Sequence, residues 1–425
     1  MNFIEELRWR GMIHDMTPGI EEKMQKESVA GYAGFDPTAT SLHIGHLIPI
    51  MLLMHFQRCG HKPIALVGGA TGMIGDPSGK SEERKLLSSE QIALNQECIR
   101  KQLEKFLNFS GDNAAEIVNN YTWFKEMSFL DFLRDVGKYL TVNYMVSKDS
   151  VKNRWENGIS YTEFSYQLLQ AYDFCWLYTN KNCVLQIGGS DQWGNITSGT
   201  ELVRRKASGE AFALTCPLLT RADGKKFGKT EGGESVWLDP KLTSPYKFYQ
   251  YWLNAADEDA PRLLRIFTLL SQDEIIGLEQ EHQKAPHERI MQKALAKDVT
   301  TRVHSSDDYL RATEASEILF GKGTADMLRN LSESDFLSIF DGVPQTSIST
   351  AELESGISAL DLASVKTGLF PSKGEARRMI SQGGLAVNKE KITDPAAVVN
   401  TSFLISGKYI LLQKGKKGYF IVKAA

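Results

Sequence analysis

Two histidines lie three residues apart in the segment Leu42-His43-Ile44-Gly45-His46, just before a run of apolar residues. If a helix begins here with Ser41 as its N-cap, both imidazoles lie on one face of its first turn. A helix start favours a bound phosphate, and the two imidazoles can donate hydrogen bonds to charge that develops there. Gly45 leaves room for a flat group such as adenine. A His-x-x-His pair alone is more often structural, so the neighbouring elements have to support this hypothesis.

A second candidate segment is residues 221–230, RADGKKFGKT, which contains three lysines and two glycines. This composition predicts a flexible cationic loop. Its ammonium groups could close on a pyrophosphate as a transition state forms. The alternative is a solvated basic loop with no ligand.

The glycine-rich segment 68–81 resembles a P-loop, but Ile74 occupies a position where that motif needs glycine. We interpret it as a strand-to-loop turn that brings Asp76 into a cleft, where a carboxylate could pair with a substrate ammonium. Further along, Tyr166, Gln170 and Asp173 are spaced to form one polar stripe on a helix. That stripe is either an exposed face or one wall of a ligand pocket.

Three apolar stretches, residues 29–35, 63–67 and 184–187, read as strands that end in turns rich in glycine or at Asp36-Pro37. Helical patterns alternate with them, which predicts a parallel βαβ sheet of Rossmann type. Ligands bind such sheets at the carboxyl ends of the strands, where the strand order reverses. The segment 188–193 follows the third strand, and Asp191 within it could hold a ribose.

The predicted class is α/β, with a Rossmann-like catalytic domain, an α-helical domain and a small C-terminal α+β module. We expect the catalytic domain at residues 1–244, with a helical insertion at about 82–155. The helical domain is expected at 245–322, a linker at 323–352 and the C-terminal module at 353–425.

The last 55 residues, 371–425, contain ten Lys or Arg and three Asp or Glu, a net charge of +7 in a chain whose net charge is -3. Ser372 and Glu375 form a capping-box pattern that opens a short helix, and residues 385–388 read as a strand. A basic helix followed by strands predicts binding to an RNA backbone, whereas the alternative is a solvated basic tail. The candidate RNA-binding residues are Lys373, Arg377, Arg378, Lys414, Lys416 and Lys417.

The five cysteines show no CxxC spacing, which argues against a disulfide framework and a zinc site. We therefore predict no protein-bound metal. The first 16 residues contain three acidic side chains and no apolar run, and no stretch is long enough to span a membrane. These features predict a cytoplasmic protein.

Together, His43-Ile44-Gly45-His46 and Lys226-Phe227-Gly228-Lys229-Thr230 resemble the HIGH and KMSKS motifs of class I aminoacyl-tRNA synthetases. Residues 34–38, 166–173 and 188–193 resemble the bacterial-type tyrosyl-tRNA synthetases. The resemblance covers nearly the whole chain and includes an S4-like C-terminal module. It implies activation of L-tyrosine by ATP, then transfer of tyrosine to the 3′ end of tRNA(Tyr). It also implies Mg²⁺ bound with ATP, no tightly bound cofactor, an anticodon-stem contact from the helical domain, and a homodimer.

The resemblance also implies roles for individual residues. The catalytic residues that it implies are Thr38, His43, His46, Lys226, Lys229 and Thr230. Its tyrosine-binding residues are Tyr32, Asp76, Tyr166, Gln170 and Asp173. Its ATP-binding residues are Gly34, Asp36, Gly45, Gly189, Asp191, Gln192 and Lys229, with Lys80 and Arg84 as further candidates.

Two alternatives remain open at this point. A class I synthetase for tryptophan is the nearest rival, although Tyr32 and Asp173 favour a phenol over an indole. The other is an RNA-binding paralogue without catalytic activity, which the intact His43, His46 and Lys229 argue against.

Ala33 departs from the family pattern, in which well-known members carry a cysteine that contacts the ATP ribose. Alanine cannot donate that hydrogen bond, so we predict that Ala33→Cys tightens ATP binding. The dissociation constant for ATP, measured for both proteins, tests this. An unchanged constant would refute the prediction.

Overall fold

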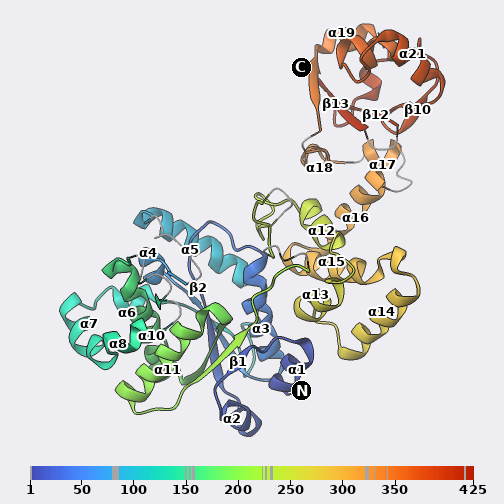
Figure 1. Cartoon of the computed structure of the whole chain (residues 1–425). Helices are drawn as coiled ribbons and strands as arrows, with labels where there is room; N and C mark the ends of the chain where they lie inside the picture. Colours follow the sequence, from blue (N-terminus) through green and yellow to red (C-terminus); the bar gives the residue numbers. More distant parts are fainter. Residues whose placement is uncertain are drawn as a thin grey trace. The chain divides into compact units, whose positions relative to one another are not determined.

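The structure, a computed structural model, describes residues 2–78, 86–148, 151–152, 155, 158–222, 224, 227–229, 233–320, 325–329, 331–341, 343–415 and 418–425. The chain divides into two compact units, which Figure 1 shows together. The first comprises Met1–Thr243 and Tyr251–His304, and the second comprises Ser244–Gln250 and Ser305–Ala425. Each unit is described by itself below.

A six-stranded sheet forms the centre of the first unit. Its strands are β1 (Asp15–Met16), β2 (Ala30–Phe35), β3 (Lys62–Val67), β4 (Glu116–Asn119), β5 (Cys183–Gly189) and β6 (Phe212–Cys216). They lie in the order β1-β6-β5-β2-β3-β4, and all pairs are parallel except β1 with β6. Nearly every residue of β2 and β3 is buried, as expected for central strands of a parallel sheet covered on both faces.

The strand order reverses beside β2. From β2 the chain adds β3 and then β4 on one side, and β5 and then β6 on the other. The turns after β2 and β5 therefore diverge at the carboxyl edge and leave a crevice between them. The predicted parallel sheet is confirmed.

Helices flank this sheet. They are α1 (Phe3–Arg10), α2 (Ile20–Lys26), α3 (Leu47–Arg58), α4 (Thr71–Ile74), α5 (Ser89–Leu103), α6 (Tyr121–Phe124), α7 (Phe129–Asp135), α8 (Val142–Val146), α10 (Tyr161–Lys181), α11 (Trp193–Ala207), α13 (Ala260–Phe267), α14 (Gln272–Lys284) and α15 (Ile290–Val303). In Figure 1, α10 and α11 lie together on one side of β2 and α3 lies on the other. Ser160 caps α10 by accepting a hydrogen bond from the Glu163 N–H.

One expected boundary differs from the structure. The described part of the stretch 82–155 contains the helices α5 to α8, and β4 within it pairs with β3 and extends the sheet. The helices α13 to α15 belong to the first unit, whereas the sequence placed them in a separate helical domain that begins at residue 245. The reason is packing: α13 contacts α1 and α3 as well as α14 and α15. The helix α12 (Pro245–Leu253) contributes residues to both units.

The expected N-cap of the histidine segment was also wrong. Ser41 is engaged elsewhere: its hydroxyl donates to the Leu42 carbonyl and accepts from the Asp239 N–H. The N-cap is His43 itself, which opens a 3-10 turn over Ile44–His46 that continues into α3. Ser271 and Glu274 form a capping box at the start of α14.

The second unit contains a five-stranded sheet in the order β10-β9-β12-β13-β7 and a two-stranded pair of β8 and β11. The strands are β7 (Gln345–Ile348), β8 (Ile357–Ser358), β9 (Leu385–Val387), β10 (Glu390–Ile392), β11 (Val398–Val399), β12 (Tyr409–Lys414) and β13 (Gly418–Ala424). The helices are α16 (Ser306–Phe320), α17 (Ala325–Arg329), α18 (Glu333–Ile339), α19 (Thr350–Ser355), α20 (Ala359–Asp361) and α21 (Lys373–Ser381).

The expected linker, residues 323–352, is part of this second unit. It contains α17, α18 and β7, and β7 pairs in parallel with the C-terminal strand β13. Phe336 and Phe340 are buried in a core with Tyr409. The basic helix was predicted correctly: it is α21, with Ser372 accepting from the Glu375 N–H. Within the described residues, no helix is long and apolar enough to cross a bilayer.

Candidate active site

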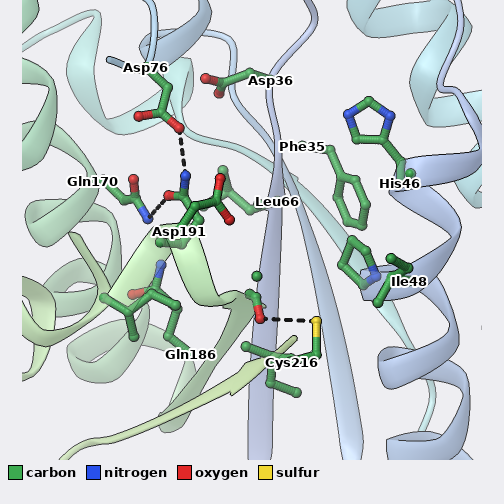
Figure 2. Close-up of a pocket in the computed structure, with 18 of the residues that line it drawn as sticks. Phe35, Asp36, His46, Ile48, Leu66, Asp76, Gln170, Gln186, Asp191 and Cys216 are labelled. Carbon is green, nitrogen blue, oxygen red and sulfur yellow. Dashed lines mark hydrogen bonds between the residues drawn. The ribbon is translucent and has the colours of Figure 1, made fainter. Parts of the chain in front are cut away.

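A cavity of about 390 Å³ opens at the carboxyl ends of β2 and β5 in the first unit. Figure 2 shows Asp76 and Gln170 on one side of it and His46 and Ile48 on the other. The cavity is therefore bounded by residues from both halves of the sheet. Its predicted members are Tyr32, Gly34, Asp36, Thr38, His43, Gly45, His46, Asp76, Tyr166, Gln170, Asp173, Gly189, Asp191 and Gln192.

A buried carboxylate, Asp173, lies at one end of the cavity. It is 2% exposed, and its two oxygens accept hydrogen bonds from Asn120 Nδ2 at 3.0 Å and Trp123 Nε1 at 2.9 Å. Burial raises the pKa of Asp173 to about 8, and these two hydrogen bonds lower it only in part. Each oxygen keeps a second lone pair, so the group can still bind a donor from a ligand.

Three polar atoms that line the cavity are buried and have no hydrogen-bond partner among the described residues. They are the phenolic oxygen of Tyr32 and the side-chain oxygens of Gln170 and Gln186. Leaving such groups unpaired costs about 1–3 kcal/mol each. A ligand that carries both hydroxyl and ammonium hydrogens would satisfy them, because amide oxygens accept and a phenol can accept or donate.

Two more carboxylates are already oriented by neighbours. Asp36 accepts from Tyr166 Oη at 2.8 Å and from Thr71 Oγ1 at 2.7 Å. Asp76 accepts from Gln192 Nε2 at 2.7 Å. Burial, with the negative charge of Asp36 second, holds the pKa of Tyr166 well above its usual range. Tyr166 thus remains a neutral hydrogen-bonding group at ordinary pH.

Across the cavity, the two histidines use their Nδ1 atoms to satisfy backbone N–H groups. His43 Nδ1 accepts from the Gly45 N–H at 3.1 Å, and His46 Nδ1 accepts from the His43 N–H at 3.2 Å. A nitrogen that accepts cannot carry the proton, so each neutral ring carries it on Nε2 and can donate from there. A Cβ at Gly45 would lie 2.8 Å from the His43 ring, so the glycine makes room for that ring.

A short extended segment, residues 235–238, joins the histidines to the lysine segment 221–230. The Val236 N–H donates to the Gly228 carbonyl at 3.1 Å, and the Val236 carbonyl accepts from the Ile44 N–H at 3.0 Å. Lys229 pairs with Ser235 as an isolated antiparallel bridge. The histidine segment and the lysine segment, far apart in sequence, are thus held beside one another.

Some predicted residues are not in the cavity lining. Lys229 is described but is not a lining residue, while Lys226, Thr230, Lys80 and Arg84 lie outside the described residues. Ala33 is buried behind the lining, and the prediction about it stays a prediction.

In the second unit, Arg377 and Arg378 are exposed, whereas Lys373 pairs with Asp361 at 2.6 Å. Lys414 lies over the Phe370 ring at 4.6 Å. Lys416 and Lys417 lie outside the described residues.

Sequence reasoning missed four residues that line the cavity or bond Asp173: Thr71, Asn120, Trp123 and Gln186. Asn120 follows β4, which was read as part of a helical insertion, so its place after a sheet strand went unnoticed. Gln186 did give a signal, because it is a polar residue inside an otherwise apolar strand.

Comparisons with known proteins show which family the chain resembles. The family described as tRNA synthetases class I (W and Y) matches residues 24–321, and the Tyrosine--tRNA ligase SYY-like C-terminal domain matches residues 335–422. A tyrosine--tRNA ligase of Cytophaga hutchinsonii is 62% identical over 99% of both chains. One of Bacteroides fragilis is 59% identical over 100% of both.

The chain belongs to the class I tyrosyl-tRNA synthetases. A solved mitochondrial tyrosyl-tRNA synthetase of Aspergillus nidulans, truncated at its C-terminus, is 31% identical with a TM-score of 0.69, over 75% of this chain and 94% of its own. A tryptophanyl-tRNA synthetase of Plasmodium falciparum has a TM-score of 0.52 at 13% identity, over 79% of this chain and 88% of its own. That second likeness shows the fold alone.

The resemblance seen in the sequence is therefore confirmed, and so is the predicted activity. The synthetase is an ATP-dependent tyrosine--tRNA ligase, and its substrates are tyrosine, ATP and tRNA. The tryptophan alternative and the inactive paralogue are both set aside by the full-length relatives that carry this name.

The raised pKa of Asp173 predicts how the stability of the synthetase depends on pH. Between pH 3.8, the ordinary pKa of the group, and about 8, the native empty pocket holds a proton that the unfolded chain has lost. Stability therefore falls as the pH rises through this window. Asp173→Asn has no group that titrates at this position, so it should not lose stability in this way. Between about pH 5 and about pH 8, we expect the melting temperature of the wild type to fall by several degrees more than that of Asp173→Asn. Thermal unfolding curves at a series of pH values measure this.

The matched control is Asp112→Asn, which replaces an exposed carboxylate of the same unit. Its melting temperature should follow the wild-type pH dependence. Parallel curves for wild type and Asp173→Asn would contradict the assignment.

Proposed function

We propose that tyrosine binds with its phenol between Tyr32 and Asp173 and its ammonium group against Asp76, Tyr166 and Gln170. The supporting observation is that polar atoms of Tyr32 and Gln170 are buried and unpaired in the cavity. A phenol can donate to the Asp173 carboxylate and accept from the Tyr32 hydroxyl. Phenylalanine would leave the Asp173 carboxylate and the Tyr32 hydroxyl without a partner. Its binding is therefore weaker by the free-energy cost of unpaired buried polar groups.

ATP then binds across the crevice, with its phosphates toward the histidines. In this proposal Thr38 and the Nε2–H donors of His43 and His46 bond phosphate oxygens, and Lys226, Lys229 and Thr230 approach the pyrophosphate. The tyrosine carboxylate attacks the α-phosphate, pyrophosphate leaves, and tyrosyl-adenylate forms without an enzyme nucleophile. Catalysis consists of positioning the reactants and stabilising charge in the transition state.

The ribose lies at the end of β5 in this proposal. The Asp191 carboxylate would accept from its hydroxyls, with Gln192 beside it and the backbone of Gly34, Asp36, Gly45 and Gly189 close to the nucleotide. A Cβ at Gly189 would lie 2.6 Å from an Asp191 oxygen, so only glycine at this position leaves room for the Asp191 carboxylate.

Mg²⁺ would arrive with ATP. Among the described residues, no group of three or more His, Cys, Asp or Glu could hold a metal ion. The ion would therefore have phosphate oxygens and water as its main ligands, and no step of the proposed reaction depends on a protein ligand to it.

The second unit would bind tRNA(Tyr). Arg377 and Arg378 are exposed on α21 and are the stronger candidates for phosphate contacts, whereas Lys373 and Lys414 already have partners in the unit. The helices α13 to α15 keep the role expected of the helical domain, contact with the anticodon stem. We infer a cytoplasmic enzyme, because this is where its tRNA substrate is charged in bacteria.

We also infer a homodimer. The short helix α7 exposes three large apolar side chains: Phe129 is 64% exposed, Leu130 74% and Leu133 36%. Their spacing places Leu133 next to both others on the helix surface. An exposed apolar patch of this kind favours contact with a second copy of the chain.

The single observation that carries the proposal is the unpaired Tyr32 hydroxyl beside Asp173, and the test is amino-acid-dependent ATP–pyrophosphate exchange. Exchange should occur with tyrosine and not with phenylalanine or tryptophan, because only tyrosine satisfies both groups. Exchange with tryptophan and not tyrosine would refute the proposed pocket.

His43 should act on the transition state more than on bound tyrosine. We expect His43→Ala to lower the rate of adenylate formation by about a hundredfold or more, as for loss of one preorganised donor. The dissociation constant for tyrosine should stay unchanged. Single-turnover kinetics and equilibrium binding measure the two quantities.

The exposed residue His287 provides a control on the same unit, and His287→Ala should leave both quantities unchanged. Equal losses of rate and of tyrosine affinity in His43→Ala would argue against a transition-state role.

A further inference from the structure

The lysine segment is anchored by contacts that the reaction itself does not explain. Its aromatic residue, Phe227, stacks on Phe267 with ring centroids 5.3 Å apart and an interplanar angle of 16°. It also contacts Trp252 at 6.0 Å and Tyr251 at 6.1 Å. These three rings come from α12 and α13, so the segment is fastened to helices that supply no lining residue of the cavity.

Hydrogen bonds fix the segment at two points. Directly before Lys229, the Gly228 N–H donates to Tyr251 Oη at 3.2 Å. Near the N-terminal end of the segment, the Ala222 N–H donates to the two Asp259 oxygens at 3.2 and 3.1 Å. Asp259 is 6% exposed, and Arg262 donates both to it and to the Thr220 carbonyl.

Gly228 lies close to the histidine segment, so a small displacement of its backbone would change the position of the lysine segment relative to the histidines. It has a φ of +89°, and a Cβ there would lie 3.4 Å from Ile44 and 3.9 Å from the Gly45 nitrogen. Lys229 follows it directly. The position of the Lys229 backbone relative to the histidine segment therefore depends on what holds the Gly228 peptide.

We propose that Tyr251 and Asp259 are positioning residues of the adenylation reaction, which hold the two ends of the lysine segment so that Lys229 can reach the ATP phosphates. This inference rests on the proposed role of Lys229. Neither residue touches the substrates; each acts through a backbone N–H of the segment. Misplacement of a reacting group by about 1 Å can lower the rate by about 10²-fold. Loss of one anchor should therefore lower kcat.

A purely structural role would have a different signature. Tyr251 packs on Trp252 at 5.3 Å, and Phe keeps that ring contact while it removes only the acceptor for the Gly228 N–H. A structural defect would lower the melting temperature or weaken tyrosine binding. A positioning defect lowers kcat and leaves KM for tyrosine unchanged.

The first experiment measures pyrophosphate exchange for full-length Tyr251→Phe. We expect kcat to fall by about tenfold with KM for tyrosine unchanged. The matched control is Tyr249→Phe on the same helix; Tyr249 is 5% exposed and packs on Tyr309. Its kcat should equal that of the wild type. A wild-type kcat for Tyr251→Phe, or an equal loss in Tyr249→Phe, would overturn the proposal.

The second experiment is a double-mutant cycle with Lys229→Ala. If Tyr251 acts through Lys229, Tyr251→Phe should have little further effect once the lysine is gone. Independent, additive losses would overturn the proposal. Asp259→Ala, which removes the acceptor for the Ala222 N–H, gives the same test at the other anchor, so the proposal can be judged even if one variant does not fold.

The cycle also separates this inference from the proposed function. A wild-type rate for Lys229→Ala would refute the proposed role of the lysine. A slow Lys229→Ala beside a Tyr251→Phe and an Asp259→Ala that both react at the wild-type rate would refute the anchors alone.

Discussion

The histidine side of the cavity depends on a short backbone segment, residues 235–238. The Val236 N–H donates to the Gly228 carbonyl and the Val236 carbonyl accepts from the Ile44 N–H, so one peptide segment holds the histidine segment beside the lysine segment, although the two lie far apart in the sequence. The hydrogen bond from the Leu238 N–H to the Leu42 carbonyl continues this ladder for one more step. Backbone hydrogen bonds are well suited to this task, because they hold position without using the side chains that the reaction needs.

At the other end of the cavity, the main constraint is a carboxylate, Asp173, that is buried away from water. Asn120 links it to the other polar groups: its Nδ2 donates to Asp173 and to Thr71 Oγ1, and its Oδ1 accepts from the Ala70 N–H. Thr71 in turn donates to Asp36, which accepts from Tyr166. One connected network therefore orients groups at both ends of the proposed amino-acid site. A change at any member should disturb several contacts at once, as networks of buried polar groups do.

Much of this could be predicted from the sequence because its signals were local. The strands that became β2, β3 and β5 were short, largely apolar stretches, and the stripe of Tyr166, Gln170 and Asp173 followed from helical spacing alone. What could not be predicted came from pairing between distant segments. The strand β4 gives no strong alternation, so Asn120 was lost with it. The N-cap of the histidine segment was misassigned because Ser41 is a better capping residue than histidine, yet its hydroxyl is used by Asp239, almost two hundred residues away.

The reversal of strand order beside β2 explains why these two ends can work on one reaction. The network around Asp173 uses residues after β3 and β4 and on α10, whereas Asp191 follows β5 and the histidines lie at the start of α3; residues of both sets line the cavity at the carboxyl ends of β2 and β5. In the proposed reaction, a carboxylate held from one side approaches a phosphate held from the other. Because that reaction needs no enzyme nucleophile, its rate depends on how firmly each side holds its reactant, and the proposed effect of α12 and α13 acts through the lysine segment.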